Sequence, residues 1–136
     1  MPFQLVRLLS RVDQSDPTNA DVFALLGSNT AFAVEGEEGA STASFQVEVQ
    51  GTEYYAQVEG LTDHDQYVLT EPSKGEAPVR FVTECGDVYR YAAFCLVRRD
   101  MVEQALRYFL ETGRRAPDLS WESTSLLLRN AKIEFE

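Results

Sequence analysis

Apolar and polar residues alternate through the middle of the chain with the period of two that β-strands require. In SFQVEVQ (residues 44–50), the odd positions from Phe45 are apolar and the even positions are polar. In EYYAQVEG (53–60), Tyr54 begins an apolar set, and Tyr55 begins the opposite, mostly polar set. Only GT separates the two runs, so the pattern predicts a β-hairpin with one buried face and one polar face.

Four more runs have the composition of strands. They are TAFAVEG (30–36), QYVLTE (66–71), VRFVTE (79–84) and VYRYAAFCLV (88–97). The last is the most apolar, which predicts a central strand buried on both faces. GEEGAST and PSKGEAP are expected to be loops, whereas residues 2–12 fit either a strand or a short helix.

The first predicted helix lies in SDPTNADVFALLGSN (15–29). Asp16 is the expected N-cap, Pro17 the first helical residue, and Gly27 the end of the helix. Val22, Leu25 and Leu26 would form its apolar stripe.

The clearest helix runs from about Arg99 to Thr112. Asp100 is its expected N-cap, with Glu103 three residues later as in a capping box, and Gly113 is suited to close it in the left-handed conformation. One stripe collects the large apolar residues at spacings of three and four. Its members are Val102, Ala105, Leu106, Phe109 and Leu110.

After this helix, Leu119 and Trp121 alternate as in a last strand, and the tail beyond them is ambiguous. The order is helix, antiparallel strands, helix, strand. It predicts an α+β fold over residues 1–136, a single domain with a mainly antiparallel sheet and two helices packed on one face.

Charge is distributed unevenly along the chain. Residues 1–79 hold thirteen acidic and three basic side chains, and residues 80–136 hold nine of each, so the first part carries the whole net charge of −10. A surface of this sign repels nucleic acid and anionic lipid and attracts a basic partner. Acidic domains are also common simply because charge keeps them soluble, so both interpretations stay open.

Catalytic and metal-binding motifs are missing from the sequence. His64 is the single histidine, and although Asp63 and Asp65 flank it, neighbouring residues of an extended strand point to opposite faces; a solvated acidic loop is the favoured interpretation. Cys85 and Cys95 are expected to be free, buried thiols in a reducing cytoplasm. No phosphate-binding loop, dinucleotide fingerprint or nucleophile elbow occurs, and no membrane span or signal peptide is expected. The sequence therefore predicts neither catalytic residues, nor a metal, nor a cofactor.

The segment MVEQALRYFLETGRRAPDLSW (101–121) resembles the C-terminal signature of a bacterial immunity-protein family, the first-numbered Imm family of polymorphic toxin systems. The resemblance rests on an amphipathic helix that ends in an aromatic residue, a Thr-Gly stop, a basic residue, a proline and a strand with tryptophan. The matching residues are Ala105, Phe109, Thr112, Gly113, Arg115, Pro117 and Trp121. Proline stands four residues after the glycine, where the family pattern has three.

The resemblance implies a cytoplasmic inhibitor that binds a cognate toxin domain and blocks its active site. Members are often encoded beside toxins that modify nucleic acids, including deaminases. A basic toxin would complement the acidic half of the chain and associate with it rapidly.

We expect the contact surface to lie in the first 79 residues, where carboxylates would pair with toxin Lys or Arg and tyrosines would anchor. Tyr55 and Tyr67 are expected on the solvent side of the sheet, with packing of the tyrosines under a loop as the open alternative. The candidates are Glu35, Glu37, Glu38, Glu53, Tyr55, Asp63, Asp65 and Tyr67.

Two alternatives remain open. The first is a small-ligand-binding or regulatory module with a sizeable apolar cavity under a helix. The second is an enzyme that uses the region of His64, which would require that His64→Ala abolish an activity.

Overall fold

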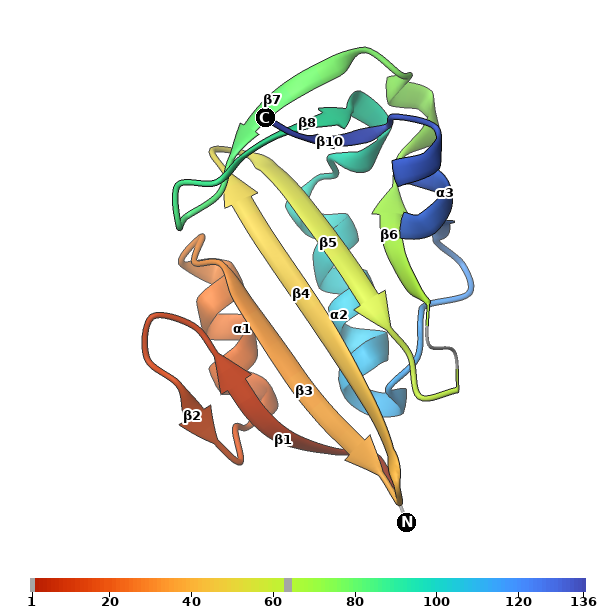
Figure 1. Cartoon of the computed structure of the whole chain (residues 1–136). Helices are drawn as coiled ribbons and strands as arrows, with labels where there is room; N and C mark the ends of the chain where they lie inside the picture. Colours follow the sequence, from red (N-terminus) through yellow and green to blue (C-terminus); the bar gives the residue numbers. More distant parts are fainter. Residues whose placement is uncertain (1, 63–64) are drawn as a thin grey trace.

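The computed structural model describes residues 2–62 and 65–136. Its main element is a seven-stranded antiparallel sheet with the strand order β2-β1-β3-β4-β5-β6-β9. The strands are β1 (Gln4–Leu9), β2 (Gln14–Ser15), β3 (Phe32–Glu38), β4 (Ser41–Gln50), β5 (Glu53–Glu59), β6 (Gln66–Thr70) and β9 (Ser120–Ser123). Helices α1 (Asn19–Gly27) and α2 (Arg99–Thr112) both lie behind this sheet in Figure 1, which confirms the predicted α+β class.

The helices and the sheet enclose the main hydrophobic core. Val22 and Leu26 of α1 and Leu106 and Phe109 of α2 pack against the apolar side of β3, β4 and β5. The predicted stripe of α2 is buried along its whole length. Hydrophobic burial on one side of the sheet therefore holds both helices in place and leaves the other side of the sheet for different contacts.

A second, three-stranded sheet lies on that other side. Its order is β10-β8-β7, formed by β10 (Ile133–Phe135), β8 (Val88–Ala92) and β7 (Pro78–Val82). In Figure 1 it crosses the upper ends of β4 and β5, and helix α3 (Thr124–Arg129) lies beside β6. A second buried cluster, which includes Phe81 and Tyr91, fills the space between this sheet and the large one.

The prediction of one long central strand over residues 88–97 is wrong. The segment divides into β8 and a 3₁₀ turn, η2 (Ala93–Cys95). It is apolar because β8 is the middle strand of the small sheet and because Tyr91, Cys95 and Leu96 belong to the second core.

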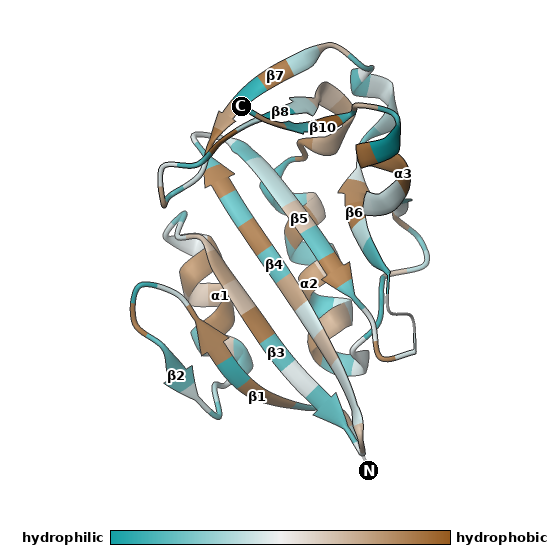
Figure 2. Ribbon diagram, in the orientation of Figure 1, coloured by the Kyte–Doolittle hydropathy of each residue, from teal (hydrophilic) through white to brown (hydrophobic). Residues whose placement is uncertain are grey.

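The β4–β5 hairpin matches its prediction. Val47 pairs with Ala56 and Glu48 with Tyr55 across the strands, and Gly51 has φ 61° in the turn. The alternation of β4 is visible as alternating brown and teal bands in Figure 2. The loop predicted over GEEGAST is shorter than expected, because β3 continues to Glu38 and β4 begins at Ser41.

The predicted helix starts differ from those in the structure. Thr18, rather than Asp16, caps α1 and forms a capping box with Asp21, whereas Asp16 has φ 49° and precedes a proline, a position that disfavours helical backbone. Helix α2 begins after Arg98, which makes no side-chain cap, so the predicted cap at Asp100 is also wrong. At its other end Gly113 has φ 70°, as expected.

The segment after α2 leads to β9, which adds Trp121 to the edge of the large sheet. Trp121 lies in β9, packs against the main core and donates a hydrogen bond from Nε1 to the Ala116 carbonyl at 2.9 Å. The Arg114 side chain binds the Thr112 carbonyl at 3.1 Å at the carboxyl end of the helix. These residues connect the second helix to the sheet edge.

The two cysteines differ in accessibility, which corrects the expectation that both are buried. Cys95 is fully buried, and burial raises the pKa of its thiol to about 12, whereas Cys85 is exposed. We expect a disulfide reagent such as dithiobis(nitrobenzoate) to modify one thiol rapidly in the native protein and the second only in denaturant. Peptide mass spectrometry should place the fast label on Cys85; rapid labelling of Cys95 would contradict the packing described here.

Candidate protein-binding surface

The large sheet presents an acidic, polar surface on the side away from α1 and α2. The register aligns Glu35 of β3 with Ser44 of β4 and Glu59 of β5 in one row across three strands. In Figure 1 the second sheet leaves the lower part of these strands uncovered. We call this surface the open face; its side chains are Glu35, Glu37, Ser44, Gln46, Gln57, Glu59 and Gln66.

Glutamine side chains form a ladder across the open face. Gln57 donates to the side-chain oxygens of Gln46 at 3.3 Å and Gln66 at 3.2 Å. Its own side-chain oxygen accepts from the Tyr55 hydroxyl at 2.9 Å. The ladder links three strands at their polar surface.

A cleft of about 310 Å³ opens where the open face passes beneath the second sheet. Its floor includes Gln46, Glu48 and Gln57, and Tyr89 and Tyr91 line it from the second sheet. Tyr91 stacks on Tyr55 at a centroid distance of 4.4 Å and on Tyr89 at 5.5 Å. The cleft therefore combines a polar floor with a wall of aromatic rings.

Glu48 is the unusual group in this cleft. Desolvation raises the pKa of its carboxyl group, and the nearby charges of Glu84 and Asp87 raise it further, against the lowering effect of Gln46 and of the Glu84 backbone. Its Oε2 atom is buried and has no hydrogen-bond partner within residues 2–62 and 65–136. A buried acceptor without a donor is unfavourable, so a donor that enters the cleft would favour a shift of this carboxyl group toward it.

Glu35 and Glu37 are the two sequence-predicted site residues that the structure brings together on the open face. They are two positions apart on β3, so their side chains share a side of the strand. Glu37 is exposed, and Glu35 accepts a hydrogen bond from Arg7 Nε at 2.8 Å. Glu38, the next residue, belongs to the opposite side of β3, beside the turn at Gly39.

The other predicted acids lie elsewhere. Glu53 stands at the far end of β5, where Lys74 pairs with it at 3.0 Å. Asp65 accepts hydrogen bonds from Ser123 and Ser125, and these bonds, with that from the Gln66 backbone, lower the pKa of its carboxyl group. This network attaches β9 to the start of β6. Asp63 lies outside the described residues.

The expectation of two exposed tyrosines is wrong. Tyr55 is 6% exposed because the second sheet covers its part of β5. Tyr67 pairs with Val58, which puts it on the side of the helices, and the Arg115 guanidinium carbon lies 3.4 Å from its ring centroid. Neither ring is available on the open face.

Several surface residues were not among the candidates. The hairpin alternation in the sequence could have identified three of them, because it places Glu48, Gln57 and Glu59 on the polar face. No sequence pattern indicates the positions of Tyr89 and Leu128, because these residues reach the cleft through the packing of the second sheet and α3. Leu128 is 60% exposed at the edge of this cleft.

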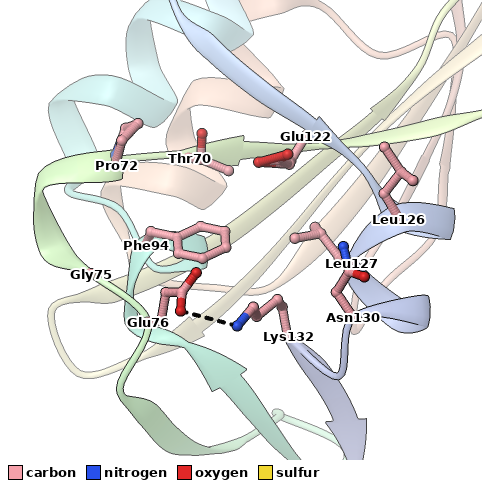
Figure 3. Close-up of a pocket in the computed structure, with 10 residues that line it drawn as sticks. All are labelled: Thr70, Pro72, Gly75, Glu76, Phe94, Glu122, Leu126, Leu127, Asn130 and Lys132. Atoms are coloured by element: carbon pink, nitrogen blue, oxygen red, sulfur yellow. Dashed lines mark ion pairs between the residues drawn. The ribbon is translucent and has the colours of Figure 1, made fainter.

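A second pocket, also of about 310 Å³, lies on the other side of α3 (Figure 3). Phe94 and Leu127 form its apolar part, and Lys132 pairs with Glu76 at 3.2 Å at one end. Its volume is at the low end for a small-molecule site. It is one pocket that the ligand-binding alternative could use; a larger one, of about 540 Å³, lies beside Glu53, Lys74 and Arg99.

Three further hypotheses concern a metal site, chemistry at His64 and a membrane-spanning helix. No group of three or more His, Cys, Asp or Glu residues within 2–62 and 65–136 is placed to hold a metal ion. His64 falls outside these residues, so the hypothesis of chemistry at that position has no structural test. None of the helices in the same ranges has the length and apolar character needed to cross a membrane.

Comparison with known proteins gives one match. The sequence model of the family described as "Immunity protein Imm1" matches residues 2–123, from just before β1 to the end of β9. Neither a curated protein nor a solved structure matches the chain. Helix α3 and strand β10 follow the matched region, so part of the wall of the cleft lies beyond it.

Proposed function

This chain belongs to the Imm1 family of immunity proteins, which makes a toxin its partner, and on that premise we propose that it inhibits a nucleic-acid-targeting toxin by covering the active site with its open face. A deaminase is our first choice of toxin. The proposed contact acids are Glu35, Glu37 and Glu59, with Glu48 in the adjoining cleft. Residues 1–136 would act as one cytoplasmic domain, without catalysis or a cofactor of its own.

The acidity of the open face is the observation that carries the proposal. Within the described residues, Arg7 is the basic side chain that pairs there, with Glu35. An enzyme that acts on DNA or RNA attracts phosphate with Lys and Arg around its active site. An acidic surface of this kind would meet those residues and exclude the substrate.

The test is competition with nucleic acid. The purified chain should form a one-to-one complex with its cognate toxin domain and inhibit it, and added substrate DNA or RNA should reduce the inhibition in proportion to its concentration. Inhibition that is unaffected by saturating substrate would rule out occlusion. Failure to form any complex would remove the proposed pairing altogether.

The ligand-binding alternative rests on the pocket in Figure 3. It requires that a metabolite raise the midpoint of thermal unfolding and that Phe94→Ala abolish the rise. Screening the chain alone by thermal shift tests this without the toxin.

A further inference from the structure

We propose that the cleft between the open face and the second sheet receives one basic side chain of the toxin, preferably arginine, between the Glu48 carboxylate and the tyrosine wall. The inference rests on the proposed function, because the toxin supplies the side chain. It adds to that proposal a defined pocket, its chemistry and the residue type that fills it.

The charge of the cleft favours a cation. Glu48 Oε2 is buried with no donor from the described chain, and the cleft lining includes a second carboxylate, that of Asp87. No Lys or Arg is among the described residues that line it. A guanidinium group offers five N–H donors and a fixed charge, so it can satisfy the buried oxygen without being neutralised.

The aromatic wall favours a planar guanidinium group over the ammonium group of a lysine. The rings of Tyr55, Tyr91 and Tyr89 are nearly parallel, with interplanar angles of 10° and 8° between successive rings. Tyr91 stacks on the Tyr89 ring and Phe135 meets the ring at 5.2 Å in a T-shaped contact, but Tyr89 is only half-buried, so part of the ring remains exposed. Arginine stacks on such rings better than lysine does. The chain itself uses this contact where Arg115 stacks on Tyr67.

The size and edge of the cleft suit a single inserted side chain. A volume of about 310 Å³ is at the low end for an independent ligand, and the exposed Leu128 at the edge can contact the aliphatic part of an arginine. An anchor of this type, surrounded by the polar open face, has the arrangement of an interface hot spot. Leu128 follows the family-matched region, so the anchor can differ between family members that share the fold.

Glu48→Gln is the decisive substitution. It keeps the shape and removes the charge, and because burial already disfavours that charge, the variant should fold. The matched control is Glu134→Gln, the same change on the exposed outer side of β10. A second variant, Tyr89→Leu, removes the stacking ring and keeps an apolar side chain. We expect toxin affinity to fall at least tenfold in E48Q and in Tyr89→Leu and to stay within twofold in E134Q.

The cation itself can be tested without the toxin. N-acetyl-arginine methylamide should shift the NMR signals of the Gln46 and Gln57 side-chain amides in the wild-type chain and not in E48Q. The neutral citrulline analogue, which has nearly the same shape, should leave them unchanged.

An E48Q affinity within twofold of wild type would overturn the inference, and so would equal shifts from the arginine and citrulline probes. If the wild-type chain binds no toxin, the proposed function has failed, and the two probes alone then decide whether the cleft selects a cation.

Discussion

Reversing Glu35, Glu37 and Glu59 to lysine should slow association with the cognate toxin by about 10- to 1,000-fold at low ionic strength, the range attributed to electrostatic steering. These three acids stand on the open face, and their reversal changes the net charge from −10 to −4. The dissociation rate should change less, because long-range attraction acts on the encounter. Stopped-flow measurements at several salt concentrations would show the difference shrinking as salt rises.

The control reverses three exposed acids that lie away from the open face, namely Glu111, Asp118 and Glu134. It makes the same change in net charge. If the open face is the contact surface, the control should lose much less association rate than the first variant. Equal losses would assign the effect to total charge, and no loss in either variant would exclude the open face.

Local patterns were sufficient to predict the elements whose contacts are close in sequence. The α2 stripe and the β4–β5 hairpin depend on spacings of three, four and two residues, and both are present as expected. The α1 cap was also encoded locally, in Thr18 followed three residues later by Asp21. Pro17 favours a cap at Asp16, but the Thr18–Asp21 pair determines the start of the helix.

The second sheet could not be predicted because its pairing is long-range. Strand β8 pairs with β10, and Ile133 faces Tyr91 across 42 positions of sequence. No periodicity within residues 88–97 distinguishes a strand of the main sheet from the middle strand of a separate one. For this reason the fold class was predicted correctly while its second layer was missed.

The same layer explains why the positions of the candidate residues on the fold could be predicted only in part. Alternation places Tyr55 and Glu59 on one side of β5. It does not reveal that the second sheet covers Tyr55 and leaves Glu59 uncovered. Tyr67 was misplaced because its side follows from the β5–β6 register, which a sequence does not show. Charge, by contrast, predicts that Glu35 and Glu37 stay out of the core, as they do in the structure, because strongly charged side chains seldom enter a core. Their contact with a partner stays a prediction.

Phe109→Ala should have the largest effect on stability, about 3–5 kcal/mol of the free energy of unfolding. The ring is fully buried near the C-terminal end of α2, 5.5 Å from the ring of Phe3 and 5.4 Å from that of Phe45. Its removal leaves a cavity between α2, the N-terminal segment and β4, and it also abolishes two aromatic contacts. The same helix holds the sheet whose other side is the open face, so toxin binding should weaken at temperatures where the variant begins to unfold.

Urea denaturation followed by Trp121 fluorescence measures this loss, as a lower midpoint with an unchanged slope. Gln104→Ala on the exposed side of the same helix is the control, and it should stay within about 0.5 kcal/mol of wild type. A Phe109 variant as stable as this control would mean that α2 does not pack on the sheet through that ring. Since Phe109 also belongs to the segment whose sequence resembles a signature of the family, its loss tests whether that segment serves the fold or the contact. The structure indicates that Phe109 serves the fold. Below the unfolding transition of the variant, we therefore expect it to bind the toxin with unchanged affinity.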